Sequence, residues 1–280
     1  MFTTLISPAS LAAHLADDRW VVVDCRFDLA EPEKGELQYL DLHIPGARYA
    51  HLDRDLSGEK TGANGRHPLP TAEQMRERFG ALGIGPDRQV VAYDADTGMY
   101  AARLWWMLRY MGHDAVAVLD GGFERWTREG HPSRGGREQW LPAAFVGAPK
   151  EDWRLSASEV LEGLEDGRHV LVDARAEARF RGENETLDKV AGHIPGARNF
   201  FFQRNLASDR TFKPAHQLRE EWERLLAGAT PDQVVMYCGS GVTACHNLLA
   251  LEHASLIGAR LYPGSWSEWS SDPSRPVEVS

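Results

Sequence analysis

Short apolar runs alternate along the chain with longer segments whose apolar residues recur at helical spacing. The runs WVVVDCR at 20–26 and HVLVDAR at 169–175 are rich in β-branched residues and are typical of buried parallel strands. QVVAY at 89–93 and QVVMY at 233–237 share that pattern. Strands that alternate with helices predict an α/β fold, with a mostly parallel central sheet flanked by helices in each domain.

The segments between these runs carry helix start and stop signals. The segments 7–17 and 156–166 both begin with serine, a favourable N-cap residue. The segment 71–84 begins with Thr71 and has Gln74 three residues later, which predicts a capping box, and Gly83 suits the C-terminal cap. Further helices are predicted within 99–112, 214–230 and 243–255.

The chain repeats itself at a separation of 143 to 150 residues. WVVVDCR is echoed by HVLVDAR, LHIPGARY at 42–49 by GHIPGARN at 192–199, and QVVAYDADTG by QVVMYCGSGV. LDGGFERW, which ends at Trp126, is echoed by YPGSWSEW, which ends at Trp269. Matches in one order at nearly one separation indicate a duplicated domain. We predict an N-terminal domain at 1–135, a linker at 136–151 that is rich in Gly, Pro and charge, and a C-terminal domain at 152–280.

Composition narrows the class of function. The 280 residues are 42% hydrophobic and 26% charged, which fits a globular protein, and the net charge of −10 argues against a nucleic-acid partner. No apolar run is long enough for a membrane span, and the first residues lack a signal-peptide pattern. There is no zinc, zincin or P-loop spacing, so neither a metal nor another cofactor is expected.

Chemistry is concentrated at one of the three cysteines. They form no CxxC pair, which favours a reducing, cytoplasmic setting. Cys238 follows a predicted strand and precedes a helix, within YCGSGVTA. The backbone N–H groups of such a glycine-rich turn can hold an anion, so a thiolate or a persulfide anion is favoured there. The alternative is a small buried residue at a tight corner. We favour a nucleophile.

The repeat and the residue spacing after Cys238 help to choose between its possible roles. The first copy has Asp94 where the second has Cys238, as expected if the first copy is catalytically inactive. Phosphatase or arsenate chemistry would use an arginine at position 244, which is alanine. Cys245 lies about two helical turns from Cys238, too far for an unstrained disulfide, and it is predicted to be core, as Cys25 is predicted to be structural.

At this point the sequence resembles the tandem-domain rhodanese sulfurtransferases. The resemblance lies in CGSGVTA after VVMY, in the two HIPGA segments and in the paired endings near Trp126 and Trp269. The GSG loop is similar to that of 3-mercaptopyruvate sulfurtransferases, whereas thiosulfate-preferring members usually carry basic residues in this loop. The resemblance implies that Cys238 takes sulfur from a small donor as a persulfide and passes it to a thiol such as thioredoxin, to a small thiol or to cyanide.

The resemblance also implies site residues. Ser240 and Asp53 match a serine and an aspartate that act with the cysteine, and His67 matches a family histidine. Arg179 falls on a substrate-binding arginine, while Arg175 and Arg181 are expected to be structural or on the surface. The loop residues Gly239, Gly241, Val242 and Thr243 are expected to hold charge through their amides.

The sequence departs from the family pattern at one residue that would bind the sulfur donor. The second substrate arginine of the family should stand a few residues before Gly192, where the chain has only Lys189. We therefore keep three hypotheses: transfer from 3-mercaptopyruvate, transfer from thiosulfate, and a persulfide carrier that receives sulfur from a partner and has little donor activity of its own.

Overall fold

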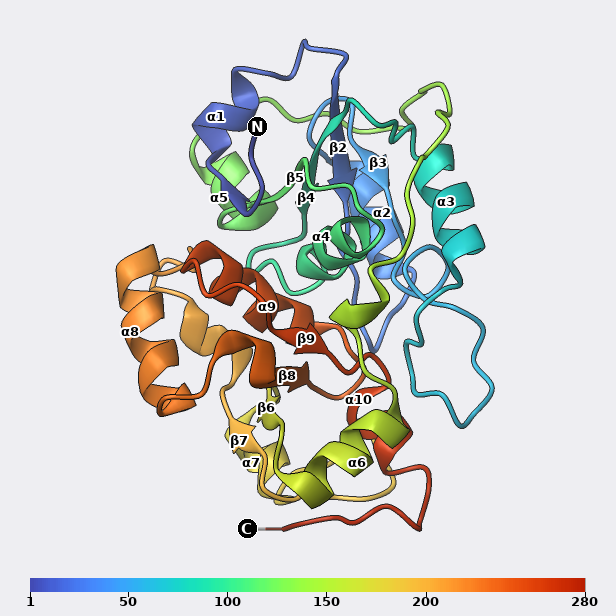
Figure 1. Ribbon diagram of the computed structural model, residues 1–280. Helices are drawn as coiled ribbons and strands as arrows, with labels where there is room; N and C mark the ends of the chain where they lie inside the picture. The colour runs from blue at the N-terminus through green and yellow to red at the C-terminus, as the bar shows by residue number, and fades with distance from the viewer. Residues whose placement is uncertain (280) are drawn as a thin grey trace. The chain divides into compact units, whose positions relative to one another are not determined.

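The computed structural model describes residues 1–279, apart from the side chain of residue 165, and the chain forms two compact units (Figure 1). Unit 1 comprises Met1–Gly58, Pro70–Lys150 and Ser208–Phe212. Unit 2 comprises Glu59–Leu69, Glu151–Ala207 and the described chain from Lys213 onward. Each unit thus takes a short segment from the other half of the sequence. Residues 136–150, predicted as part of a linker, belong to unit 1.

Unit 1 is built on a five-stranded parallel sheet. Its strand order is β1-β5-β4-β2-β3, and every pairing between these strands is parallel. The strands are β1 (Leu5–Ile6), β2 (Trp20–Asp24), β3 (Arg48–Tyr49), β4 (Gln89–Tyr93) and β5 (Val116–Leu119). The helices are α1 (Pro8–Ala12), α2 (Lys34–Asp41), α3 (Ala72–Ala81), α4 (Ala101–Tyr110) and α5 (Gly122–Arg128). Figure 1 shows helices on both flanks of this sheet.

Unit 2 repeats the plan with four parallel strands in the order β7-β6-β8-β9. The strands are β6 (Val170–Asp173), β7 (Arg198–Asn199), β8 (Val234–Tyr237) and β9 (Arg260–Leu261). The helices are α6 (Ala157–Asp166), α7 (Glu177–Phe180), α8 (Ala215–Leu226), α9 (Thr243–His253) and α10 (Ser265–Trp269). Three 3-10 turns complete the unit: η1 (Glu151–Trp153), η2 (Phe202–Asn205) and η3 (Pro231–Gln233). Helix α9 packs on β8 and runs beside β9 (Figure 1). The predicted α/β class with parallel sheets is confirmed.

The helix starts follow the predicted capping chemistry. Ser7 accepts a hydrogen bond from the backbone of Ser10, and Ser156 forms a capping box with Glu159. Thr71 and Gln74 form the predicted capping box at α3. That helix ends with Leu82 as its C-cap, and Gly83 follows with a φ of +73°. Glycine is favoured at Gly83 because the left-handed conformation carries no steric penalty there.

The repeated motifs have a structural role in both units. At the end of β2, Arg26 donates to the carboxylate of Asp24. It also donates, at 2.7 Å, to the carbonyl of Leu42, the residue directly before the first HIPGA segment. Arg175 pairs with Asp173 at the end of β6 in the same way. Both carboxylates are fully buried. A buried carboxylate requires such a partner, so the DxR pattern ties β2 and β6 each to the HIPGA segment that follows. Arg175 is therefore structural, as predicted.

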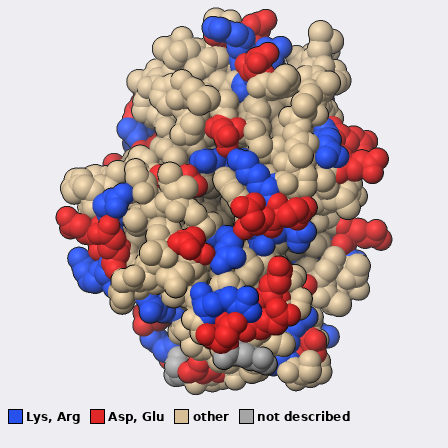
Figure 2. Space-filling view, viewed as in Figure 1, with Lys and Arg blue, Asp and Glu red and all other residues tan. Residues whose placement is uncertain are grey.

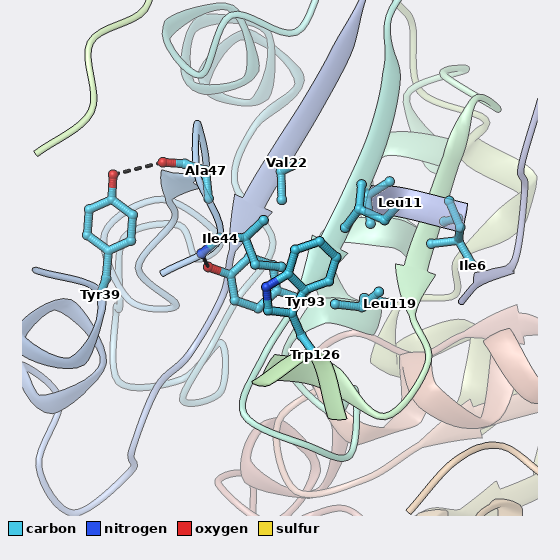
Figure 3. Packing of buried hydrophobic residues seen from close by; sticks show 11 residues of the cluster. Ile6, Leu11, Val22, Tyr39, Ile44, Ala47, Tyr93, Leu119 and Trp126 are labelled. Atoms are coloured by element: carbon cyan, nitrogen blue, oxygen red, sulfur yellow. Dashed lines mark hydrogen bonds between the residues drawn. The ribbon is translucent and has the colours of Figure 1, made fainter. Parts of the chain in front are cut away.

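Each unit has its own apolar core. In Figure 3 the rings of Tyr93 and Trp126 lie among Ile6, Leu11 and Leu119 of unit 1. The core of unit 2 is its counterpart, with rings from β8, β9 and α10: Tyr237, Tyr262, Trp266 and Trp269. Burial of one such side chain contributes about 1.5–3 kcal/mol to folding. These rings hold the carboxyl ends of β4 and β8, where the two loops of interest begin.

Charged side chains of both signs lie intermixed on the face shown in Figure 2. Among the described residues, no helix has both the length and the apolar character that a membrane span requires.

Candidate active site

Cys238 lies at the carboxyl end of β8, an inner strand of the unit 2 sheet. Its residue is 2% exposed. The backbone N–H of Cys238 donates to Ser265 Oγ at 3.1 Å, and its carbonyl accepts from the N–H of Trp266 at 2.9 Å. Both contacts come from the start of α10, so the strand end and that helix hold the cysteine backbone in place. This is the edge at which parallel α/β sheets bind ligands.

The loop after Cys238 contains two glycines, and the backbone requires one of them, Gly241. Gly241 has a φ of +75°, and a Cβ atom on it would stand 2.3 Å from the carbonyl oxygen of Pro263. Val242 then caps α9 without a side-chain hydrogen bond, and the helix begins at Thr243. The N-terminus of α9 is therefore directed at the loop through its backbone N–H groups, which favour an anion there.

Gly239 lies against two arginine side chains. A Cβ atom on Gly239 would stand 2.8 Å from Arg66 Nη2 and 3.6 Å from both terminal nitrogens of Arg179. Two guanidinium groups therefore lie against the residue that follows Cys238. Arg179 comes from α7, where the sequence predicted a substrate-binding arginine.

Ser240 and His67 meet although they are 173 residues apart in sequence. Ser240 Oγ and His67 Nδ1 lie 2.7 Å apart, and the residues are 8% and 4% exposed. His67 belongs to Glu59–Leu69, the segment that the first half of the chain contributes to unit 2. A hydroxyl hydrogen-bonded to a buried imidazole can move a proton beside the cysteine.

Arg66, which precedes His67, is a residue of the site that the sequence motifs did not single out. Its guanidinium forms an ion pair with Asp188, and its backbone N–H donates to Ser267 Oγ at 3.0 Å. The available signal was its position in the RHPLP motif, directly beside a residue already singled out. The residue pattern alone does not show that Glu59–Leu69 packs with the second repeat.

The roles predicted for several other residues remain without a test. Asp53 belongs to unit 1, where its backbone N–H donates to His51 Nδ1 at 3.1 Å, and its predicted action with Ser240 stays a prediction. Arg181 is engaged by Glu177 and Glu183 on the surface side of α7. The amide roles predicted for the loop residues stay predictions.

The other two cysteines are buried core residues. Cys25 is 1% exposed, and burial raises the pKa of its thiol well above the usual value. Cys245 is fully buried in α9, and its thiol donates to the carbonyl of Gly241 at 3.3 Å. Both observations agree with the predicted structural roles.

The corresponding loop of unit 1 contains a carboxylate at the cysteine position. Asp94 follows β4 as Cys238 follows β8, and its carbonyl accepts from the N–H of Phe123 at the start of α5. Its carboxylate accepts from three backbone N–H groups, those of Gly98, Tyr100 and Ala101, at 2.8, 2.8 and 3.2 Å. Burial raises the Asp94 pKa to about 6, against the opposing effect of those hydrogen bonds. The first loop therefore holds an anion of its own.

Comparison with known proteins agrees with this geometry. The rhodanese-like domain model matches residues 7–129 and 156–272. A protein of Pseudomonas aeruginosa named as a probable 3-mercaptopyruvate sulfurtransferase is 46% identical over 275 residues, which are 98% of this chain and 97% of the relative. The thiosulfate sulfurtransferase of Bos taurus is 34% identical over 255 residues, 89% of this chain and 84% of the relative.

A solved structure shows the same fold. The 3-mercaptopyruvate sulfurtransferase from Leishmania major superimposes with a TM-score of 0.85 at 31% identity, over 96% of this chain and 74% of that chain. With two domain matches in one chain and relatives of this similarity over nearly its full length, the chain belongs to the rhodanese family of sulfurtransferases, in its two-domain form.

Proposed function

We propose that this protein transfers a sulfane sulfur from 3-mercaptopyruvate to a thiol or cyanide through a persulfide on Cys238. The observation that carries the proposal is the arrangement around the loop of unit 2. A cysteine at the strand end adjoins a hydroxyl–imidazole pair and two guanidinium groups. The names of similar proteins support the donor class, because they include 3-mercaptopyruvate and thiosulfate sulfurtransferases.

The chemistry balances without another reactant. The Cys238 thiolate attacks the sulfur of 3-mercaptopyruvate, a sulfur–sulfur bond forms, and the carbon–sulfur bond breaks. The electron pair of that bond passes to the carbon fragment as an enolate, which takes a proton and leaves as pyruvate. An acceptor thiolate then attacks the outer sulfur and releases Cys238. Such double displacement predicts ping-pong kinetics.

Each nearby group has a part in this sequence. The amides at the start of α9 stabilise the charge on the thiolate and on the persulfide. Ser240, hydrogen-bonded to His67, stands where it can exchange a proton with the donor or with the leaving enolate. Arg179 supplies positive charge for the carboxylate of the donor. Asp53 as an orienting group for the serine, and a reducing setting for the cysteine, remain parts of the proposal.

Thiosulfate is the second candidate donor, and a specific observation favours it. Thiosulfate is a small dianion, which two guanidinium groups beside the cysteine can also bind. The uncharged loop GSG between Cys238 and Val242 offers no further cation for it. A neutral hydroxyl at position 240 suits a donor that needs a proton for its leaving carbon, so we rank 3-mercaptopyruvate first.

Steady-state sulfur transfer with each donor separates the hypotheses. We expect a higher kcat/KM with 3-mercaptopyruvate than with thiosulfate, and a mass increase of one sulfur atom on Cys238 when the acceptor is omitted. A higher kcat/KM with thiosulfate would overturn the choice of donor. No turnover with either donor, together with persulfide uptake from a cysteine desulfurase, would identify a carrier instead.

A further inference from the structure

Arginine and acidic side chains form a compact cluster beside the cysteine loop. Asp188 bridges two of them: one carboxylate oxygen pairs with Arg66 Nη1, and the other accepts from Arg179 Nη2 at 3.3 Å. Glu185 accepts from Arg179 Nε and Nη2, at 3.1 and 2.9 Å. The side chains of Asp188 and Glu185 are only 6% and 2% exposed. Two guanidinium groups can lie close together here because they share a buried carboxylate.

The guanidinium of Arg66 divides its contacts between this cluster and the loop. Nη1 donates to Asp188 and to the carbonyl of Leu187, whereas Nη2 is the atom that approaches Gly239. The Arg66 side chain is 28% exposed. Arg179 likewise donates to the acids through Nε and Nη2, and its Nη1 and Nη2 would each lie 3.6 Å from a Cβ atom on Gly239. Both guanidinium groups therefore lie against Gly239, the neighbour of Cys238.

Unit 1 shows what an arginine at the equivalent position binds. Arg66 and Arg210 each stand four residues before the proline that precedes the next helix, Pro70 and Pro214. Arg210 Nη1 donates to the carboxylate of Asp96 at 2.6 Å, and Asp96 lies in the unit 1 loop, two residues after Asp94. The residue two positions after Cys238 is Ser240. The unit 2 loop thus lacks the carboxylate that engages the equivalent arginine in unit 1.

We propose that Arg66 is a donor-binding residue: together with Arg179 it binds the anionic group of the sulfur donor over Gly239, in the way that Arg210 binds Asp96. This inference rests on the proposed function and extends it. It supplies the second cation that the sequence lacks before Gly192, from a segment far away in the chain. Lys189, the one basic residue near the expected position, is exposed. The expected ligand class is a small mercapto-carboxylate, with its carboxylate held by two guanidinium groups.

Alkylation of Cys238 tests this inference without any sulfur donor. Iodoacetate carries a carboxylate, whereas iodoacetamide is a neutral reagent of nearly the same size. The ratio of their rate constants at Cys238 therefore reports the positive charge beside the sulfur, after each rate is corrected for that of Cys238→Ser. We expect Arg66→Gln to lower this ratio about fivefold, because glutamine retains length and an N–H donor but not charge. Arg181→Gln, which removes a cation from the C-cap of the helix that contains Arg179, is the matched control and should leave the ratio unchanged.

The outcomes are distinct. A selective fall in the iodoacetate rate in Arg66→Gln, with partial recovery in Arg66→Lys, supports the proposal. An unchanged ratio overturns it. An equal fall in both rates also overturns it, because that result would mean that Arg66 shapes the loop and does not attract the anion.

Steady-state kinetics provide the second measurement. Arg66→Gln should raise KM for 3-mercaptopyruvate about tenfold with a smaller change in kcat, as expected for loss of a charged hydrogen bond to substrate. A fall in kcat with KM unchanged would contradict a binding role. If the wild-type protein turned over neither donor, the proposed function would fail while the alkylation ratio would still decide the role of Arg66.

Discussion

The loops after β4 and β8 share one backbone frame and differ in where their negative charge comes from. In unit 1 the carboxylate of Asp94 accepts the N–H groups of Gly98, Tyr100 and Ala101. In unit 2 the corresponding residue is Cys238, which has one sulfur atom in place of the two carboxylate oxygens. The first loop has a carboxylate of its own, whereas under the proposed function the second loop stabilises a charge that appears only during reaction.

The two loops also differ two residues further on, where unit 1 has Asp96 and unit 2 has Ser240. Asp96 in the first loop pairs with Arg210, so that a cation and its anion both belong to the protein. In the second loop Ser240 contacts His67, and Arg66 lies against Gly239. A duplicated fold can therefore lose a reaction by filling its site with its own acidic side chains, without a change of fold. Each prediction below tests this comparison, beginning with the largest effect.

Removal of the nucleophile should distinguish the loops most sharply. We expect Cys238→Ser to lower sulfur transfer about 10³-fold or more, because a hydroxyl is a poor nucleophile for sulfur at neutral pH. Cys245→Ser, within helix α9, should retain activity within about threefold. Asp94→Cys should add no sulfur-transfer activity. Turnover rates and intact-protein mass measure these effects. Full activity in Cys238→Ser would refute the assignment of the site.

Removal of the internal anion should affect stability instead. Asp94→Ala leaves three backbone N–H groups without their acceptor, and we expect a loss of about 3 kcal/mol in the free energy of unfolding near pH 5. Cys238→Ala should cost less than about 1 kcal/mol, because a thiol contributes little to satisfying such groups. Urea unfolding measures both. Equal losses would show that the two loops do not differ in this way.

The same carboxylate should make stability depend on pH. The pKa of Asp94 rises to about 6 in the folded protein, so folding favours its protonated form. Its contribution is therefore fully present near pH 4 and is lost as the pH rises through 6. We expect the stability difference between wild type and Asp94→Ala to shrink by about 2–3 kcal/mol between pH 4 and pH 7. Unfolding at several pH values provides the measurement, and a difference independent of pH would contradict the raised pKa.

Substitutions of Ser240 and His67 should lower turnover less, and their effects on turnover should be coupled. We expect Ser240→Ala and His67→Ala each to lower turnover of 3-mercaptopyruvate about tenfold, and the double variant to lose little more than either one. Such non-additivity follows if one residue acts through the other across their 2.7 Å contact. Asp96→Ala, at the position of the first loop that corresponds to Ser240, should leave turnover unchanged. Fully additive losses would show that Ser240 and His67 act separately.

Much of the fold could be predicted because its signals are local. Apolar runs such as WVVVDCR became β2, and Ser156 and Thr71 cap the helices that they precede. Repetition then extended each assignment from one half of the chain to the other. The exchange of short segments between the units had no local signal, since Glu59–Leu69 and Ser208–Phe212 contain no regular element. Arg66 was missed for this reason.

By itself, the sequence determined the parallel α/β architecture and the duplication, and it singled out Cys238 as the candidate nucleophile, because hydrophobic periodicity, helix caps and a glycine-rich turn depend on neighbouring residues. Only the tertiary structure decided which distant side chains stand at that cysteine loop. Ser240 and His67 meet across 173 positions, and Arg66 reaches Gly239 from the other half of the chain. In the folded chain, burial and ion pairs such as that between Arg66 and Asp188 bring these groups together. No short stretch of the sequence contains all of them.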